Sequence, residues 1–307
     1  RASSGDITHP IVHKVVACLL ASVLLDGSRP IPTTLATWNT TLAVNALSNA
    51  SEDVKSLGCL DWLLDCQNVE PHPYTGAAPG GWGWSDLSGA VPDADDTPGA
   101  LLALAHHSDA EDCDTHTRIR ITKAAKRGAR WLLDLQNDDG GWPTFCRGWG
   151  KLPFDRSGAD LTAHAIRALT AWREDIDNEQ YSTAMEQGVR YLLTQQRTEG
   201  EWVPLWFGNQ DDPNEENPVY GTSKVLLALA TLRGTSNGRA RLLPSRNGAE
   251  VSDDGSAGAS PSQVGGASRF QAEEREQALR RGVQWLVQRQ NADGGWGGQV
   301  IPAAGKK

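Results

Sequence analysis

The chain has 307 residues, of which 39% are hydrophobic, and its 38 acidic against 29 basic side chains give a net charge of −9. The apolar fraction is too high for a disordered chain, and the length suffices for one large domain or two ordinary ones. The negative charge disfavours nucleic acid as the main partner, because phosphate binding needs a basic surface. Tryptophan is unusually frequent, with 12 residues against 4 Phe and 4 Tyr.

The N-terminal region contains a short apolar stretch. This stretch, residues 11–25, is shorter than the roughly 20 apolar residues that a membrane-spanning helix needs. The five cysteines are irregularly spaced and form no paired CxxC, so they indicate neither a zinc ribbon nor a disulfide framework. Such thiols are typical of a reducing compartment, which favours a cytoplasmic protein. The first residue, Arg1, suggests a partial sequence.

One sequence pattern occurs four times along the chain. The copies read WLLDCQ from residue 62, WLLDLQNDDGGW from 131, YLLTQQRTEGEW from 191 and WLVQRQNADGGW from 285. Gln67, in the first copy, is followed by a longer loop before Trp82. The glycine pair permits a tight turn, and the indole can cover helix ends and donate a hydrogen bond. The tryptophans interpreted as structural are Trp62, Trp131, Trp285 and Trp296.

A second fourfold pattern lies between these copies. The segments WNTTLAVNAL (38–47), DDTPGALLAL (95–104), DLTAHAIRAL (160–169) and YGTSKVLLAL (220–229) align without gaps. Their apolar spacing predicts helices, and the Thr near each start suits an N-terminal cap. These residues are Thr40, Thr97, Thr162 and Thr222. The two patterns together predict an all-α fold of helical hairpins, with no competing strand pattern.

The spacing of the repeats predicts the domain organisation. Residues 1–233 are expected to form α/α barrel hairpins. Residues 234–269 are rich in Gly, Ser, Asn and Arg without periodicity, and they are expected to form a flexible insert. Residues 270–307 are expected to supply a final outer helix and its Gln/Trp loop.

The segment VPDADDTP at 91–98 places Asp93, Asp95 and Asp96 at the start of a predicted helix. Like-charge repulsion and burial raise the pKa of at least one of them, so that a protonated acid can persist and donate a proton. The plainer alternative is helix capping, because acids at a helix N-terminus satisfy free N–H groups and favour the dipole.

The repeat alignment gives the acid cluster neighbours. The position of Asp95 is occupied by Trp38, Asp160 and Tyr220 in the other copies. If these helices form an inner ring, the four side chains line a cavity mouth with two aromatics and two acids. A lone His on an apolar helix is more often a core residue, but His164 could instead polarise the carboxyl cluster.

Together, the Q…GGW loops, PDADDT and the DLTAHAIRAL helix resemble the squalene–hopene cyclases, which are bacterial class II triterpene cyclases. The repeats are similar to that family's QW motif, and DADD is similar to its DxDD acid motif. The resemblance implies an (α/α)6 toroid-type barrel and proton-initiated cyclisation of squalene, or a similar linear polyprenoid, to a hopene-like triterpene. It also implies no cofactor, no metal, peripheral contact with the inner face of the membrane, and a homodimer.

The resemblance implies a role for each matching residue. Asp95 would donate the proton to the terminal alkene, and Asp93 and Asp96 would support its acidity. His164 would hydrogen-bond Asp95 and stabilise its carboxylate after proton transfer. Tyr220, in VYGT, would lie near the acid and help its reprotonation through water.

The resemblance also implies aromatic contacts with the substrate. Protonating an isolated alkene needs a strong acid in a dry site. Aromatic faces then stabilise the carbocations through cation–π attraction, worth up to ~2 kcal/mol each. Phe145 stands where the family usually has Tyr, and Trp84 where it usually has Phe. The implied substrate-binding residues are Trp38, Trp84, Trp142, Phe145 and Trp206.

The chain departs from the resembled family in length, because the usual enzyme is about twice as long. Four complete hairpins and one helix predict an incomplete barrel. A non-catalytic QW-repeat relative or an inactive fragment, whose acids only cap helices, is therefore an alternative. A protein prenyltransferase β-subunit is another, but it needs zinc held by Asp, Cys and His, and no matching constellation is visible. The acidic stretch at 211–217 is interpreted as a solvated loop.

Overall fold

The computed structural model describes residues 34–50, 52–73, 75–87, 89–109, 113–147, 155–176, 178–210, 212–233 and 266–296, together with the single positions 13, 16, 17 and 20. The chain divides into two compact units, Arg1–Leu35 and Ala36–Lys307, and the second holds every element named below. Within the described ranges, no helix combines the length and the apolar character needed to cross a membrane.

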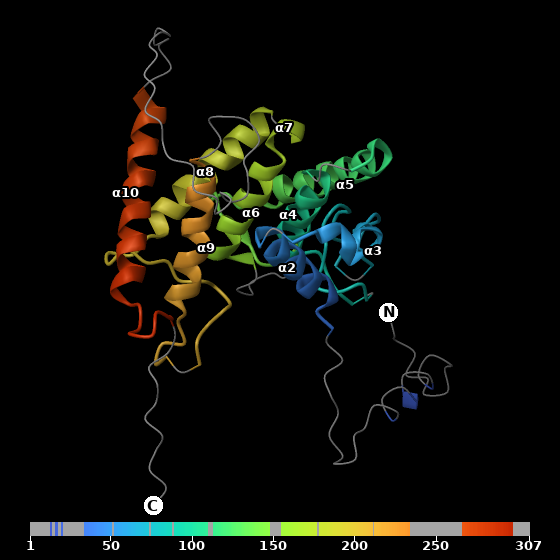
Figure 1. Ribbon diagram of the computed structural model, residues 1–307, viewed down its shortest axis with the longest axis horizontal. Helices are drawn as coiled ribbons and strands as arrows, with labels where there is room; N and C mark the ends of the chain where they lie inside the picture. Colours follow the sequence, from blue (N-terminus) through green and yellow to red (C-terminus); the bar gives the residue numbers. More distant parts are fainter. Residues whose placement is uncertain are drawn as a thin grey trace, which may run out of the picture. The chain divides into compact units, whose positions relative to one another are not determined.

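Four helices form a row, which we call the inner row: α2 (Ala36–Asn49), α4 (Asp96–Asp109), α6 (Ala159–Ala171) and α9 (Pro218–Thr231). Along this row α2 packs against α4, α4 against α6, and α6 against α9 (Figure 1). The central helices α4 and α6 bury 12 of 14 and 11 of 13 residues, respectively. They are therefore buried on nearly all sides rather than along one stripe.

The helices of the other repeat pattern form an outer row: α3 (Leu60–Asp65), α5 (Thr115–Leu135), α8 (Glu179–Gln195) and α10 (Gly266–Gln288). In this row α5 packs against α4, α8 against α6, and α10 against α9. A 3-10 helix, Val54–Leu57, and a short helix, α7 (Arg173–Ile176), lie in the connections. The predicted all-α fold of helical hairpins is confirmed, and the hairpins form an incomplete α/α toroid.

The Gln/Trp loops bind each hairpin to the next. Gln136 Nε2 donates to the carbonyl oxygens of Gly140, at 2.8 Å, and of Ala184 on α8, at 2.9 Å. Trp142 Nε1 donates to the carbonyl of Leu132 at 2.8 Å. The same bonds run from Gln67 to Gly80 and Ala124, from Trp82 to Leu63, from Gln196 to Gly200 and Ala278, and from Trp202 to Leu192. Each indole therefore bonds to the outer helix of its own hairpin, and each glutamine also bonds to the next outer helix. Trp142, which was expected to contact substrate, is one of these indoles.

Glycine is required where an indole meets the next outer helix. A Cβ added at Gly188 of α8 would lie 2.8 Å from Cζ3 of Trp142 and 3.2 Å from Cδ1 of Ile166. Gly128 and Gly282 meet Trp82 and Trp202 in the same way. The absence of a side chain lets the indole lie against the helix backbone, so each Gln/Trp loop fits one glycine of its neighbour.

The prediction that the repeat threonines cap their helices is wrong. The N-cap of α9 is Asn217, whose side chain accepts from the amide of Tyr220 at 3.2 Å. Thr222 lies inside that helix, and its hydroxyl accepts from the amide of Trp202 at 3.0 Å. The helices begin earlier than the apolar pattern indicated, and Thr97, Thr162 and Thr222 bind the tryptophan loops instead. The other inner-row threonines also lie within their helices, Thr40 in α2, Thr97 in α4 and Thr162 in α6.

Two short strands were not predicted. β1 (Trp142–Pro143) pairs with β2 (Ser157–Gly158) in antiparallel register, Trp142 opposite Gly158. Strands of two residues are too short to show an alternating pattern in the sequence. Their pairing fixes the backbone directly before α6.

The predicted insert at 234–269 falls mostly outside the described residues, which resume at the start of α10, Gly266. Cys59, Cys66, Cys113 and Cys146 are all free thiols.

Candidate active site

The acid motif lies at the start of α4, where Asp93 caps the helix. Its Oδ1 accepts from the amides of Asp95, at 2.9 Å, and Asp96, at 2.6 Å. The amide of Asp93 donates to Trp82, and a β-bridge pairs Asp93 with Phe145. Two tryptophan loops therefore hold the motif, and the capping interpretation is correct for Asp93.

Asp95 has different surroundings, because both of its carboxyl oxygens face side chains of neighbouring inner helices. Its Oδ2 accepts from Nε1 of Trp38 on α2 at 3.1 Å. Its Oδ1 lies 3.1 Å from Nδ1 of His164 on α6. The side chains of Asp95 and His164 are only 16% and 7% exposed. Three consecutive inner helices thus meet at one buried carboxyl group.

The three carboxyl groups have unequal acidities. Burial and the negative charge of Asp96 raise the pKa of Asp93 well above its usual range. Burial also raises the pKa of Asp96 to about 7, against the effect of its hydrogen bond with Asp93. Burial acts on Asp95 too, but hydrogen bonds from His164 and Trp38 and the charge of Lys224 outweigh it and lower the pKa of Asp95. Asp95 is therefore the strongest acid of the cluster.

His164 is neutral at neutral pH. Burial and the positive charge of Lys224 lower its pKa to about 4, although the neighbouring Asp95 acts in the opposite direction. A neutral imidazole carries one N–H, and Nδ1 is the ring nitrogen within hydrogen-bonding distance of Asp95. His164 therefore donates a hydrogen bond to the carboxylate without a charge of its own.

Asp160 and Tyr220 start the next two inner helices. Asp160 Oδ1 accepts from the amide of Leu205 at 3.3 Å, while its buried Oδ2 has no hydrogen-bond partner in the described part of the chain. Burial raises the pKa of Asp160 to about 6. The Tyr220 ring lies 4.8 Å from that of Phe207. Burial, followed by the charges of Asp95 and Asp160, raises the pKa of Tyr220.

The predicted aromatic residues divide into two groups. Trp84 and Phe145 make an edge contact at 6.0 Å, and Trp206, which is 40% exposed, donates its indole N–H to Thr144 next to Phe145. Trp142, by contrast, is fully buried, with its indole bonded to the Leu132 carbonyl in the way described above. The structure therefore brings Trp38, Trp84, Phe145 and Trp206 to the acid end of the inner row, and Trp142 into the interior between hairpins.

Three residues near the acid were not singled out as functional by the sequence. Phe207 follows Trp206 and packs on Tyr220. Lys224 lies one turn after Tyr220 on α9, with Nζ 5.2 Å from the centre of that ring. Arg167 lies three residues after His164 on α6 and is half-buried. The helical spacing from the repeat positions was the signal that could have found the two cations.

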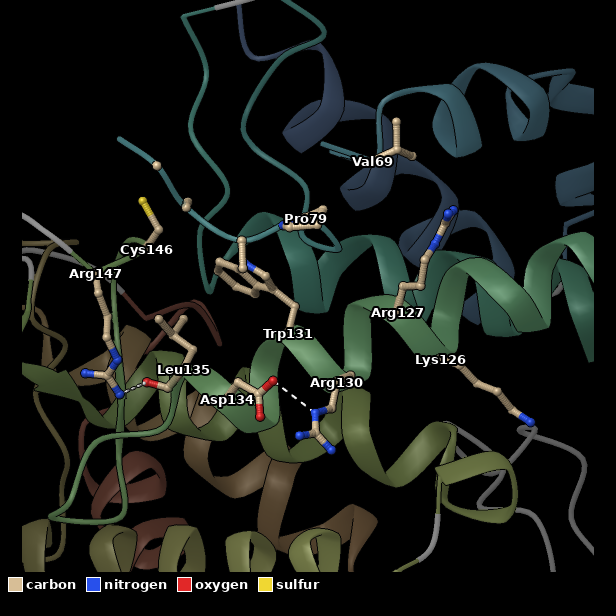
Figure 2. Close-up of a pocket in the computed structure, with 13 residues that line it drawn as sticks. Val69, Pro79, Lys126, Arg127, Arg130, Trp131, Asp134, Leu135, Cys146 and Arg147 are labelled. Carbon is tan, nitrogen blue, oxygen red and sulfur yellow. Dashed lines mark hydrogen bonds and ion pairs between the residues drawn. The ribbon is translucent and has the colours of Figure 1, made fainter. Parts of the chain in front are cut away.

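A separate cavity of about 570 Å³ lies beside α5. Figure 2 shows Trp131, Leu135 and Arg147 around it, with Arg130 directed toward Asp134. Arg147 donates to the Leu135 carbonyl at 2.8 Å, and Arg130 pairs with Asp134 at 2.9 Å. None of the acid-motif residues lines this cavity, so it is distinct from the candidate active site. In the described residues, no three His, Cys, Asp or Glu side chains are arranged to hold a metal ion.

Comparison with known proteins identifies the family. Residues 35–243 match the family model described as the squalene-hopene cyclase C-terminal domain. The chain is 26% identical over 284 residues to the squalene–hopene cyclase of Bradyrhizobium diazoefficiens, covering 86% of this chain and 35% of that protein. It is 26% identical over 304 residues to the squalene–hopene cyclase of Alicyclobacillus acidocaldarius, covering 84% and 44%. The chain thus spans less than half the length of these relatives.

A solved structure supports the same fold. The ent-copalyl diphosphate synthase from Streptomyces platensis aligns with a TM-score of 0.52 and 21% identity, covering 95% of this chain and 41% of that one. The family match covers well over half of the chain and includes the whole inner row. The chain therefore belongs to the family of the squalene-hopene cyclase C-terminal domain, within the class II terpene cyclases.

Proposed function

We propose that the protein starts the cyclisation of a linear polyprenoid by protonating an alkene with Asp95. The observation that carries this proposal is the buried Asp95 carboxyl, with one oxygen on Trp38 and the other on His164 at 3.1 Å each. Both neighbours stabilise the carboxylate that remains after the proton has left, which makes the protonated form a strong acid.

The proposed reaction is balanced by protons alone. The O–H bond of Asp95 breaks as a C–H bond forms at one alkene carbon, and the other carbon becomes cationic. Intramolecular attack by the next double bonds closes the rings, and loss of a proton, or capture of water, ends the reaction. Asp96, with a pKa of about 7, is partly protonated near neutral pH, and we assign to it, with Asp93 and Tyr220, the return of a proton to Asp95.

Aromatic side chains would stabilise the cationic intermediates. Trp38, Trp84, Phe145 and Trp206 come from three different repeats and lie at the acid end of the inner row. Their faces can attract a carbocation without trapping it as a nucleophile would. Trp142 is left out of this assignment, because its indole is enclosed between two hairpins.

Squalene is the first substrate to test, since several relatives carry it in their names. A linear polyprenoid partitions into bilayers, which supports the proposal that the whole protein collects its substrate at the inner face of the membrane. A homodimer remains a prediction.

The experiment incubates wild-type and Asp95→Asn forms of the full-length protein with linear polyprenoids, squalene first and geranylgeranyl diphosphate next, followed by mass analysis of the extracted lipid. Asp134→Asn, on the exposed face of α5, is the matched control. Loss of cyclic product in Asp95→Asn alone is the expected result. Equal product from both variants would contradict the assignment of Asp95.

A non-catalytic relative is the second candidate, favoured by the cap that Asp93 makes on α4. It requires that no polyprenoid binds near Asp95. Quenching of tryptophan fluorescence by a polyprenoid analogue, lost in Trp38→Phe, would decide against it.

A further inference from the structure

Two cations lie on the same side of the inner row as the acid. Counting from the repeat position that holds Asp160 on α6 and Tyr220 on α9, Arg167 is seven residues on and Lys224 is four residues on. Positions separated by four and seven residues lie on one face of a helix. Since α6 and α9 pack against each other, the two cations lie on neighbouring helices. Arg167 is two turns beyond Asp160, and Lys224 is one turn beyond Tyr220.

Lys224 is half-buried and has no ion pair or hydrogen bond to any described residue. Its Nζ lies over the ring of Tyr220, 5.2 Å from the centre. Burial lowers the pKa of Lys224, and the charge of Arg167 adds to this effect, against the carboxylates of Asp95 and Asp160. A second cation therefore lies close enough to Lys224 to disfavour its charge.

Arg167 is also without a partner. Its Nε is buried and makes no hydrogen bond, and no ion pair joins its guanidinium to a carboxylate in the parts of the chain that the structure describes. Burial lowers the pKa of Arg167. Elsewhere in the chain arginines meet carboxylates closely, as Arg197 does with Glu216 and Arg289 with Glu199, both at 2.6 Å.

The neighbouring acids compensate this pair only in part, because the charge of Asp95 favours the charged form of Lys224, whereas no described carboxylate forms an ion pair with Arg167. Both oxygens of Asp95 are engaged by Trp38 and His164, and Asp160 has a raised pKa because its second oxygen is buried without a partner. Partly buried charges of one sign are costly unless an opposite charge joins them. The charge of Lys224, which acts on Asp95, also opposes the development of a carbocation beside that acid.

We infer that Arg167 and Lys224 bind an anionic group of the substrate, so that the substrate is a polyprenoid carrying a diphosphate or a carboxylate rather than a neutral hydrocarbon. The inference rests on the proposed function, which supplies the polyprenoid to which the anionic group is attached. Binding of such a group neutralises the two cations and removes their repulsion of the carbocation. The forked guanidinium suits either a phosphate or a carboxylate, and the ammonium adds a point charge.

Binding of four probes to the full chain tests the inference by calorimetry: geranylgeranyl diphosphate, geranylgeranoic acid, geranylgeraniol and squalene. Charge-assisted hydrogen bonds predict that at least one anionic probe binds about 10- to 100-fold more tightly than the alcohol. Arg167→Gln and Lys224→Gln should each remove most of that advantage and leave geranylgeraniol unaffected. The stronger of the two anionic arms identifies the group as a diphosphate or a carboxylate.

Arg190→Gln is the matched control, because Arg190 is an exposed arginine on α8 paired with Glu186. It should bind all four probes as the wild type does. Arg167→Lys and Lys224→Arg keep the charge and should restore part of the affinity, which separates loss of charge from loss of folding. Circular dichroism checks the helices of each variant.

Equal affinity of the wild type for the anions and the alcohol would overturn the inference, as would anion binding unchanged in both Gln variants. Product analysis of the same samples separates the two proposals. Cyclic product from squalene at equal rates in wild type and Gln variants would keep the proposed function and refute the anion site. Charge-dependent binding without any cyclic product would refute the proposed function and keep the site.

Discussion

Asp95 and Asp160 occupy the same repeat position on neighbouring helices, yet their surroundings differ. Asp95 receives hydrogen bonds from Trp38 and His164, supplied by the inner helices on either side, and its pKa is lowered. Asp160 receives one bond from the amide of Leu205 and keeps a buried oxygen without a partner, so its pKa rises to about 6. Equivalent positions in a repeat therefore fix where a carboxyl lies, and the neighbouring repeats fix its chemistry.

The difference comes from the next helix along the row. His164 lies four residues after the repeat position on α6 and reaches Asp95 on α4. Lys224 has the corresponding place on α9, but it extends over the Tyr220 ring and forms no ion pair with Asp160. The same repeated position thus holds His164 on α6 and Lys224 on α9. His164 hydrogen-bonds Asp95, whereas Lys224 forms no ion pair with Asp160.

The largest expected effect is on turnover. If only Asp95 donates the proton, Asp95→Asn should lower kcat by about 10²- to 10⁴-fold, the range typical of a lost general acid. Asp160→Asn keeps the size and the neutral state of a protonated carboxyl, so its loss of kcat should be much smaller. Cyclic product measured under single-turnover conditions makes the comparison. Equal losses would show that both acids take part in the proton transfer.

The second prediction concerns stability against pH. The folded-state pKa of Asp160, about 6, lies above the ordinary value of 3.8, so the folded state binds the proton more tightly and stability falls as the pH rises from about 4 to 6. The difference corresponds to about 3 kcal/mol. Asp160→Asn should reduce this decline. The lowered pKa of Asp95 has the opposite sign, and its contribution is lost on acidification.

Urea unfolding at pH 2.5, 4.5 and 8 measures both signs, the lower interval for Asp95 and the upper interval, from pH 4.5 to pH 8, for Asp160. Asp93 and Asp96 also have raised pKa values, so the protein should lose stability over the upper interval even after Asp160 is replaced. Asp160→Asn should depend less on pH than the wild type between pH 4.5 and 8, and Asp95→Asn should depend less on pH between pH 2.5 and 4.5. The same slope in both variants would contradict the unequal surroundings of the two acids.

The sequence predicted the helices and the acid cluster well, because both depend on local patterns. Apolar spacing identified the inner helices, and the placement of Asp93, Asp95 and Asp96 at one helix start needed no tertiary information. The bond from Trp38 to Asp95 joins residues 57 positions apart, and no local pattern contains it. Trp142 shares its residue type with Trp38, Trp84 and Trp206, but only the packing of α8 shows that its indole is enclosed.

The third prediction weakens Asp95 without removing it. Trp38→Phe keeps an aromatic face and deletes the indole N–H that bonds Oδ2. The loss of a hydrogen bond to a charged group, about 1.5–3 kcal/mol, corresponds to a decrease in kcat of about 10- to 100-fold. The pKa of Asp95 should rise, so the alkaline limb of the pH–rate profile should move to higher pH. A lower kcat with an unmoved limb would indicate lost packing instead.

The smallest effect on turnover is expected from Thr97 and Thr162, which lie two residues after Asp95 and Asp160. Each threonine joins its helix to a tryptophan loop. Thr97 accepts from the amide of Trp82 at 2.9 Å and donates to its carbonyl at 3.2 Å, whereas Thr162 accepts from the amide of Trp142 at 3.0 Å. Valine has the same shape without the hydroxyl, so Thr97→Val leaves two buried backbone groups of Trp82 without this partner. We expect it to cost about 1–3 kcal/mol in urea unfolding.

Thr162→Val should cost less, because it removes one bond and Trp142 is also held by the pairing of β1 with β2. The ratio of the two losses in free energy of unfolding therefore measures how far the loop before each inner helix depends on its threonine.

Turnover provides a second measurement. The loop of Trp82 continues to Trp84, whose carbonyl accepts from the amides of Thr37 and Trp38 at the start of α2. Thr97→Val should therefore shift Trp38 away from Asp95 and lower kcat by more than Thr162→Val does, even where both variants remain folded.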